Sequence, residues 1–250
     1  MALSGYVFDH TAAAEDVSEV MQPVADQLTF IYGNDFRVPS GKTMIAMAQP
    51  LGSGANQFQL DSPELRSVSR LWIAPPEASD QIDSFGPTPN FLDNPPIIRP
   101  GESMNAYAEA NAAADRTQLG VWLADTIPAA VRGQNIRTVR GTTTGNFAAG
   151  AWTTQQITLD QDLPKGWYQL VGAKVVGGGQ FARFIFPDSQ NERMMVPIVP
   201  TANTQWDQIF RYGRLGAWGQ FENFVSPKIE IFGIAQTTGQ TVYLDVVRMS

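Results

Sequence analysis

Two stretches of the sequence decide the fold: ESMNAYAEANAAADRTQLGVWLAD at residues 102–125 and PKIEIFGIAQTTGQTVYLDVVRM at residues 227–249. Each stretch holds two runs of alternating apolar and polar residues separated by a short polar turn, which is typical of two antiparallel strands. One stands near the end of the first half of the chain and the other at the C-terminus. The spacing therefore predicts equivalent β-hairpins at residues 103–124 and 228–248, and with them a duplicated β fold. If the two are equivalent, Trp122 and Tyr243 occupy matching places. Period-2 alternation then predicts that the residues facing the core are Leu119, Val121 and Leu123 in the first copy and Val242, Leu244 and Val246 in the second.

A weaker similarity extends this duplication upstream. LRSVSRLWIAPPE at residues 65–77 and GQFARFIFPDS at residues 179–189 both read as strands that contain an arginine and end in an aromatic residue, a proline and an acidic turn. We therefore predict one copy over residues 29–128 and a second over 138–250, joined by residues 129–137. Each copy has the size of a jelly roll of eight strands, although an immunoglobulin-like sandwich also fits.

The rest of the chain after residue 28 has the composition of an all-β protein. Short runs rich in β-branched and aromatic residues alternate with turn residues, and no helical pattern separates them. An antiparallel sandwich or barrel is therefore favoured over a doubly wound parallel sheet. The expected fold class is all-β, with two tandem jelly-roll β-barrels and a short N-terminal helix or arm. The predicted strands are Thr29 to Ile31, Lys42 to Gln49, Phe58 to Leu60, Arg66 to Ile73, Ser103 to Ala110, Gln118 to Leu123, Arg137 to Thr142, Thr153 to Leu159, Gly166 to Val176, Phe181 to Phe186, Met194 to Val199, Gln208 to Tyr212, Lys228 to Ala235 and Thr241 to Arg248.

Residues 1–28 carry the one helical pattern in the sequence. Thr11 suits a helix N-cap, and apolar residues follow it at i, i+3, i+4 and i+7 spacing, namely Val17, Val20, Met21 and Val24. Pro23 limits or kinks such a helix. The pattern predicts a short helix that either packs under the domain or forms an arm reaching a neighbouring subunit.

Charge is unevenly distributed along the chain. Residues 1–131 contain 16 acidic and 6 basic residues, for a net charge of −10, whereas residues 132–250 contain 8 and 11, for +3. Complementary halves attract each other within a chain or between copies. The stretch up to Leu28 is acidic and has no basic residue, which disfavours direct packaging of nucleic acid.

Composition points to surfaces covered by partners. Only 16% of the residues are charged while 43% are hydrophobic, and arginines outnumber lysines by 13 to 4. Arginine suits the paired, partly buried positions of subunit interfaces better than lysine does. No secretory signal is expected at the N-terminus, and no apolar run approaches the roughly 18 residues of a membrane span.

The sequence predicts no catalytic, cofactor or metal site. The sequence has no cysteine and a single histidine, His10, so it can supply neither a thiolate nucleophile nor a histidine-rich metal centre. His10 is interpreted as a surface or interface residue. Carboxylates are interpreted as polar faces of strands or as solvated turns rather than as glycosidase pairs or calcium ligands. The glycine-rich segments 52–56 and 175–181 lack the lysine and the setting of a phosphate loop. The carboxylates weighed are Glu102, Glu109, Glu222, Glu230, Asp80, Asp83, Asp93, Asp160 and Asp162.

Aromatic residues gather in YGRLGAWGQFENF at residues 212–224. Tyr212, Trp218, Phe221 and Phe224 alternate there with glycine and polar residues. Such a pattern fits a platform on which sugars stack, and equally fits the filling of a barrel end or a subunit contact.

Two tandem jelly rolls without a catalytic constellation resemble the double jelly-roll major capsid proteins of tailless, membrane-containing icosahedral bacteriophages, the corticovirus-like members of the adenovirus-type lineage. The resemblance rests on the repeated terminal pattern at 103–124 and 228–248, the short chain and the acidic N-terminal stretch. It implies a homotrimer of six barrels that forms a pseudo-hexagonal unit of an icosahedral shell. It also implies contacts with neighbouring capsomers, and with minor capsid or membrane proteins through the N-terminal arm.

The resemblance further implies location in the virion after synthesis in the host cytoplasm, no enzymatic activity, no cofactor and no sequence-specific binding of nucleic acid. Two alternatives stay open from the residues themselves. One is a carbohydrate-binding β-sandwich protein, and the other is a phage spike or accessory structural protein.

Overall fold

The computed structural model describes residues 3–25, 31–32, 35–52, 54–75, 90–186, 193–199, 208–233 and 239–249. The chain divides into two compact units, Ser4–Ile127 and Pro128–Ser250. Because residues 128–131 carry no charge, the first unit holds the acidic excess found above and the second the basic excess. Each unit is built on one sheet, and apart from two short 3₁₀ turns the named elements are all strands.

The first unit contains nine strands and one 3₁₀ turn, η1 at Leu65–Ser67. The strands are β1 Leu3–Thr11, β2 Glu19–Pro23, β3 Ile31–Tyr32, β4 Asp35–Arg37, β5 Met44–Leu51, β6 Ala55–Asp61, β7 Leu71–Ile73, β8 Ser103–Ala110 and β9 Arg116–Ala124. The second unit contains eight strands and the 3₁₀ turn η2 at Gln208–Phe210. Its strands are β10 Arg137–Thr143, β11 Thr153–Leu159, β12 Trp167–Val176, β13 Phe181–Ile185, β14 Met195–Val199, β15 Gly219–Glu222, β16 Lys228–Phe232 and β17 Thr241–Arg248.

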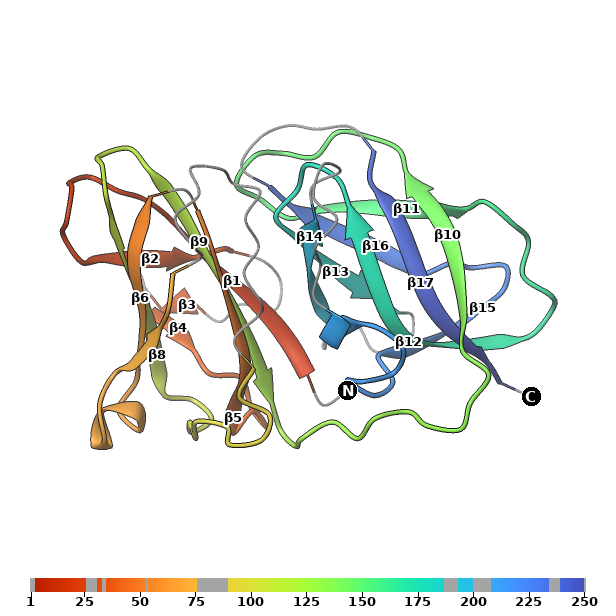
Figure 1. Ribbon diagram of the computed structural model, residues 1–250, viewed down its shortest axis with the longest axis horizontal. Coiled ribbons are helices and arrows are strands. Elements are labelled where there is room, and N and C mark those ends of the chain that lie inside the picture. The colour runs from red at the N-terminus through yellow and green to blue at the C-terminus, as the bar shows by residue number, and fades with distance from the viewer. Residues whose placement is uncertain are drawn as a thin grey trace. The chain divides into compact units, whose positions relative to one another are not determined.

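The second unit is a jelly roll. Its first strand pairs with its last, the second with the seventh, the third with the sixth and the fourth with the fifth, all antiparallel: β10 with β17, β11 with β16, β12 with β15, and β13 with β14. This is a long hairpin rolled up so that its two arms alternate, as in two linked Greek keys. Figure 1 shows β10 beside β17 in this unit. A parallel pairing of β12 with β14 joins the two halves of the sheet.

The first unit repeats this scheme. β1 neighbours β9, β2 pairs with β8, and β6 pairs with β7. The place of the sixth strand is taken by an isolated bridge from Met47 of β5 to Asn90. Both units are therefore jelly rolls by strand pairing, which confirms the predicted all-β fold with two tandem jelly rolls.

The terminal hairpins predicted at 103–124 and 228–248 are wrong as hairpins, although both pairs of strands exist. β8 pairs with β2, β4 and β6, while β9 lies between β1 and β5; in the second unit β16 pairs with β11 and β13, while β17 lies between β10 and β12. The consecutive strands thus turn to different partners instead of to each other. The pattern marks equivalent strands of the duplication, and residues far away in sequence supply their partners.

Two β-bulges align the units residue by residue. In the first unit the register shifts between Ile45 and Met47, opposite Leu123 and Trp122; in the second it shifts between Leu170 and Gly172, opposite Val246 and Asp245. Matching the bulges places Trp122 on Asp245, so the expected equivalence of Trp122 with Tyr243 is wrong by two residues. The expected core residues match one to one and are all buried: Leu119 with Val242, Val121 with Leu244, and Leu123 with Val246.

The helix predicted within residues 11–28 is wrong. The segment instead contributes the end of β1 and the whole of β2, and β1 lies between β2 and β9 inside the first sheet. Tyr6, Phe8 and Met21 belong to the buried core of that unit, whereas Val17 and Val20 are exposed. Because Met21 and Pro23 are buried two residues apart, the segment follows the period of a strand. An arm reaching out to partners is therefore excluded for the described part of residues 1–28.

Two further expectations need correction. The run Gln208 to Tyr212 forms η2 and a turn rather than a strand, and only Leu71–Ile73 of the run Arg66 to Ile73 is a strand. The similarity between residues 65–77 and 179–189 also pairs strands of different rank, because β7 is the fifth strand of its roll and β13 the fourth. Of the predicted strands, residues 29–30 and 234–235 lie outside the described part of the chain.

Core leucines on the final strands test the duplication. We expect Leu123→Ala and Leu244→Ala each to lower the free energy of unfolding by about 2 to 5 kcal/mol, the usual cost of truncating a buried leucine. Urea unfolding followed by hydrogen exchange assigns each loss to its own unit. Ile127→Ala, at an exposed position just after the first roll, is the control and should change little. Losses as small as that of the control would contradict the core assignment.

Candidate assembly surfaces

One face of the first sheet carries a row of side chains on the side away from the core, with exposed residues at its two ends and the buried Gln59 between them. Across four strands the register aligns Val20 of β2, Tyr107 of β8, Gln59 of β6 and Trp72 of β7. Ala106 and Ala108 point into the core, so Tyr107 and its row point outward. Trp72 is 58% exposed and Val20 is 40% exposed. We call this row, together with Arg70, the Trp72 face.

Arg70 fixes the middle of the Trp72 face. Its guanidinium lies 4.9 Å from the centre of the Tyr107 ring, and Nη1 donates a hydrogen bond of 2.9 Å to Oε1 of Gln59. The buried Asp61 accepts two hydrogen bonds from Arg66, at 2.6 and 2.5 Å, and these hydrogen bonds raise the pKa of Arg66. Tryptophan, tyrosine and arginine are the residue types that dominate binding energy in protein interfaces.

The second unit presents a different row on the outer side of its sheet. The register aligns Arg140 of β10, Tyr243 of β17 and Lys174 of β12. Because Val242 and Leu244 are in the core, Tyr243 and its neighbours face outward. Partial burial and the nearby charge of Arg211 lower the pKa of Lys174. We call this row of two cations and a tyrosine the Tyr243 row.

A buried ion pair supports the sheet beside the Tyr243 row. Asp245, which is fully buried, accepts hydrogen bonds of 2.6 and 2.7 Å from Arg211, one of 2.7 Å from Thr138 and one of 2.9 Å from the backbone N–H of Tyr212. Gly172 makes room for this contact, because a Cβ there would lie 2.8 Å from Oδ2 of Asp245. The segment that carries Arg211 is thereby fixed against the outside of the sheet.

A second buried cluster lies on the strands β13 and β16. Arg183 is fully buried, donates a 2.7 Å hydrogen bond to Glu230, and stacks 3.8 Å from the centre of the Trp152 ring. Arg193 forms a second ion pair with the same carboxylate. The cluster accounts for Glu230, one of the carboxylates weighed from the sequence, as a structural residue.

Three of the other candidate carboxylates have separate structural contacts, whereas Asp93 is exposed and Asp162 lines a hollow of the second unit. Glu102 accepts hydrogen bonds from the backbone N–H groups of Glu64 and Arg99, Glu109 is bonded to Gln57, and Asp160 pairs with Arg140. Glu222 faces Trp167 across β12 and β15. Asp80 and Asp83 lie outside the described residues. In the described part of the chain, no cluster of three His, Asp or Glu side chains is placed to hold a metal ion.

His10 is a half-buried residue of the first unit. Its Nε2 lies 2.7 Å from Oε2 of Glu19, which also accepts a hydrogen bond from the backbone N–H of Ala13. The hydrogen bonds from Ala13 and His10 together lower the pKa of Glu19. This contact links β1 to β2.

Among the described residues, no helix is long and apolar enough to cross a membrane.

The aromatic residues of 212–224 do not form one platform. Trp218 and Phe221 are buried in the core, whereas Tyr212 and Phe224 are exposed. The sugar-stacking interpretation is therefore wrong for the set as a whole. Phe224 alone lines a hollow at one end of the second barrel.

Sequence reasoning missed the Trp72 face because its members come from four separate strands. Trp72 was visible as an aromatic residue at the end of a predicted strand, but Val20 lay within the predicted helix. The pairing of β2 with β8 places Val20 beside Tyr107, and these two residues are almost 90 positions apart in the chain. A strand pattern in β2, with Met21 and Pro23 as the inward pair, was the available signal.

Comparison with known proteins gives structural neighbours and no family. No family model matches the chain, and no curated protein does so. Among solved structures, the major capsid protein P2 from bacteriophage PM2 is similar at 6% identity and a TM-score of 0.26, over 98% of this chain and 98% of that one.

Two structures from archaeal viruses are also similar. A chain described under the triple jelly roll fold and turret assembly in an archaeal virus is 12% identical at a TM-score of 0.20, over 98% of this chain and 78% of its own. A chain of Sulfolobus turreted icosahedral virus is 13% identical at a TM-score of 0.20, over 100% of this chain and 81% of its own. All three TM-scores and all three sequence identities are low.

Proposed function

We propose that this chain is a major capsid protein that assembles as homotrimers into the icosahedral shell of a bacteriophage. The observation that carries the proposal is the tandem repeat of one jelly-roll strand pairing, with aligned bulges, in a single chain of 250 residues. Three chains with two similar barrels each bring six barrels to a trimer, which gives a near-hexagonal unit suited to tiling. The proposed location is the virion, and the proposed partners are further copies of the chain. No enzymatic role is proposed.

The two outward rows support assembly by contact between unlike surfaces. The Trp72 face belongs to a unit with a net charge of −10, and the Tyr243 row belongs to a unit with +3. Net charges of opposite sign steer the unlike units of neighbouring copies toward each other, and the aromatic and arginine side chains of the two rows give the contact its affinity. A contact between unlike surfaces closes into a three-membered ring when each copy is rotated by a third of a turn from the last, as a trimer requires.

Mass measurement of the purified full chain tests the proposal. We expect a species of three times the 27.3 kDa chain mass in mass photometry at micromolar concentration. Electron microscopy of the same material under crowding conditions should show flat hexagonal arrays or shells. A stable monomer at micromolar concentration would exclude the trimer, and a monomer that hydrolyses or tightly binds glycans would favour the carbohydrate-binding alternative.

Truncation of the exposed tryptophan should weaken assembly. We expect Trp72→Ala to cost about 2 kcal/mol or more of association free energy, the size of an interface hot spot. The matched control is Val68→Ala, since Val68 is 91% exposed in the same unit but lies outside the sheet. Concentration-dependent mass photometry should show dissociation of the Trp72 variant at higher concentration than wild type or control. Equal behaviour of both variants would remove the Trp72 face from the interface.

A further inference from the structure

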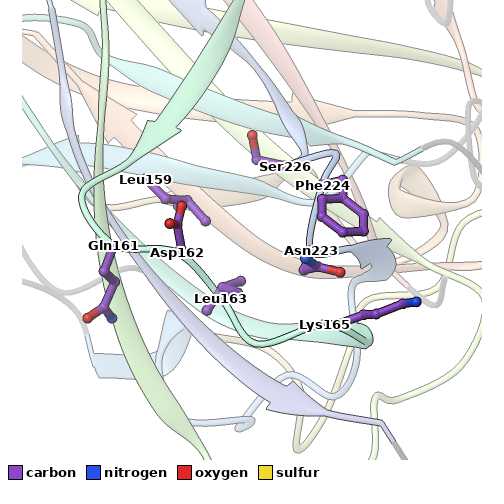
Figure 2. A pocket seen from close by; sticks show the side chains of 8 residues that line it. All are labelled: Leu159, Gln161, Asp162, Leu163, Lys165, Asn223, Phe224 and Ser226. Carbon is purple, nitrogen blue, oxygen red and sulfur yellow. The ribbon is translucent and has the colours of Figure 1, made fainter.

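A hollow of about 490 Å³ opens at one end of the second barrel. Two loops form it: one follows β11 and leads into β12, and the other joins β15 to β16. Figure 2 shows Leu159, Gln161 and Asp162 on one side and Asn223, Phe224 and Lys165 on the other. Its apolar lining comes from Leu159, Leu163 and the ring of Phe224, which is 73% exposed.

The polar lining contains groups that are free to bind. The side chains of Gln161, Asp162 and Lys165 have no hydrogen-bond or ion-pair partner within the described part of the chain. The Gln161 amide can donate and accept hydrogen bonds, the Asp162 carboxylate accepts them, and the Lys165 ammonium group donates them. Asn223 uses Oδ1 to accept a hydrogen bond from the backbone N–H of Gly166, which leaves its NH₂ group available.

The shape of the hollow is held by bonds between its two loops. Gly166 and Asn223 are joined twice, because the N–H of Asn223 also donates to the carbonyl of Gly166 at 3.1 Å. Ser226 donates a 2.7 Å hydrogen bond to the carbonyl of Ile157, and Gln156 donates a 2.9 Å hydrogen bond to the Ser226 hydroxyl. The backbone of the two loops is thus held in place around the hollow before any ligand arrives, as is usual for small-molecule sites.

We propose that this hollow is a binding site for a saccharide. A sugar ring has an apolar face of C–H groups that packs on an exposed aromatic ring, and hydroxyl groups at its edge that both donate and accept hydrogen bonds. Phe224 supplies the ring, Asp162 accepts from two neighbouring hydroxyls, and Lys165 and the Asn223 amide donate to others. One carboxylate and one ammonium balance each other, which favours a neutral sugar over a nucleotide or a sugar phosphate.

The site goes beyond the assembly role and does not depend on it. A surface that binds a sugar would let the protein attach to a glycan-coated cell or retain a glycan of its surroundings. Mass photometry reports the oligomeric state and does not detect sugar binding, so loss of sugar binding would leave the measured mass of the assembly unchanged.

Binding to defined sugars tests the proposal. Full-length protein is screened on an array of neutral and acidic mono- and oligosaccharides, and the hits are measured by saturation-transfer NMR and calorimetry. We expect binding of at least one neutral sugar, and a loss of about tenfold or more in affinity for both Phe224→Ala and Asp162→Asn, corresponding to one lost anchoring contact each.

Matched controls lie next to these positions. Val225 is exposed beside Phe224 without lining the hollow, and Asp160 lies two residues before Asp162 and pairs with Arg140. We expect Val225→Ala and Asp160→Asn to bind the same sugar within about twofold of wild type. Absence of any array binding, binding that survives both test variants, or selective binding of phosphorylated sugars alone would each overturn the proposal.

Discussion

Deletion of residues 1–27 is expected to abolish folding of the first unit while the second unit stays folded. The deletion removes β1, which is the first strand of the rolled hairpin and one neighbour of β9, and β2, which is one of the partners of β8. Tyr6, Phe8 and Met21 leave the core at the same time. Two strands would then expose unpaired backbone groups, and a unit of this size cannot offset the loss of three large buried side chains.

Hydrogen exchange of the full deletion variant measures this effect unit by unit. The amides of β8 and β9 should lose their protection, while those of β10, β12 and β17 keep theirs. Removal of Met1 and Ala2 alone is the control, because β1 begins at Leu3. Retained protection in β8 and β9 would mean that residues 1–27 are a dispensable arm after all.

The strands were more predictable than their partners. Alternation at Leu119, Val121 and Leu123 correctly identified a strand with one face in the core, because side chains of a strand point alternately to opposite faces. The same alternation carries no information about which strand lies alongside. In a jelly roll the neighbour of the last strand is the first, so the predicted hairpins named equivalent strands but the wrong pairs.

The N-terminal segment shows how two periods become confused. Val17, Val20, Met21 and Val24 fit the helical spacing, yet Met21 and Pro23 also fit a strand, and five residues of strand are too few to separate the two patterns. The segment forms a strand because it pairs with β8 and places the Met21 side chain in the core. Tertiary packing thus overrode the local preference.

The candidate surfaces depend on contacts that sequence spacing does not encode. Arg70 reaches Gln59 and Tyr107 only because β6 is paired on both sides, with β7 and with β8. The hollow at Phe224 likewise needs the bond between Gly166 and Asn223, which are 57 residues apart. The charge difference between the halves, in contrast, was readable from the sequence because it is a property of composition.

The buried ion pair of the second unit gives the largest effect expected of a single substitution. Asp245→Asn removes the charge that compensates Arg211, whose side chain is only 6% exposed. An arginine cannot lose its proton to escape this position, so its charge stays buried without a counter-charge. We expect a loss of about 3 to 5 kcal/mol in the free energy of unfolding of the second unit.

Two comparisons separate this charge effect from a general loss of packing. Asp160→Asn breaks the exposed pair with Arg140 and should cost about 1 kcal/mol or less. The double variant Arg211→Met with Asp245→Asn removes both charges and should recover part of the stability lost in the single variant. Urea unfolding reports the free energies, and hydrogen exchange of β12 and β17 locates them. If Asp245→Asn is no more destabilising than Asp160→Asn, the pair does not hold the Arg211 segment on the sheet, and the Tyr243 row loses its structural support.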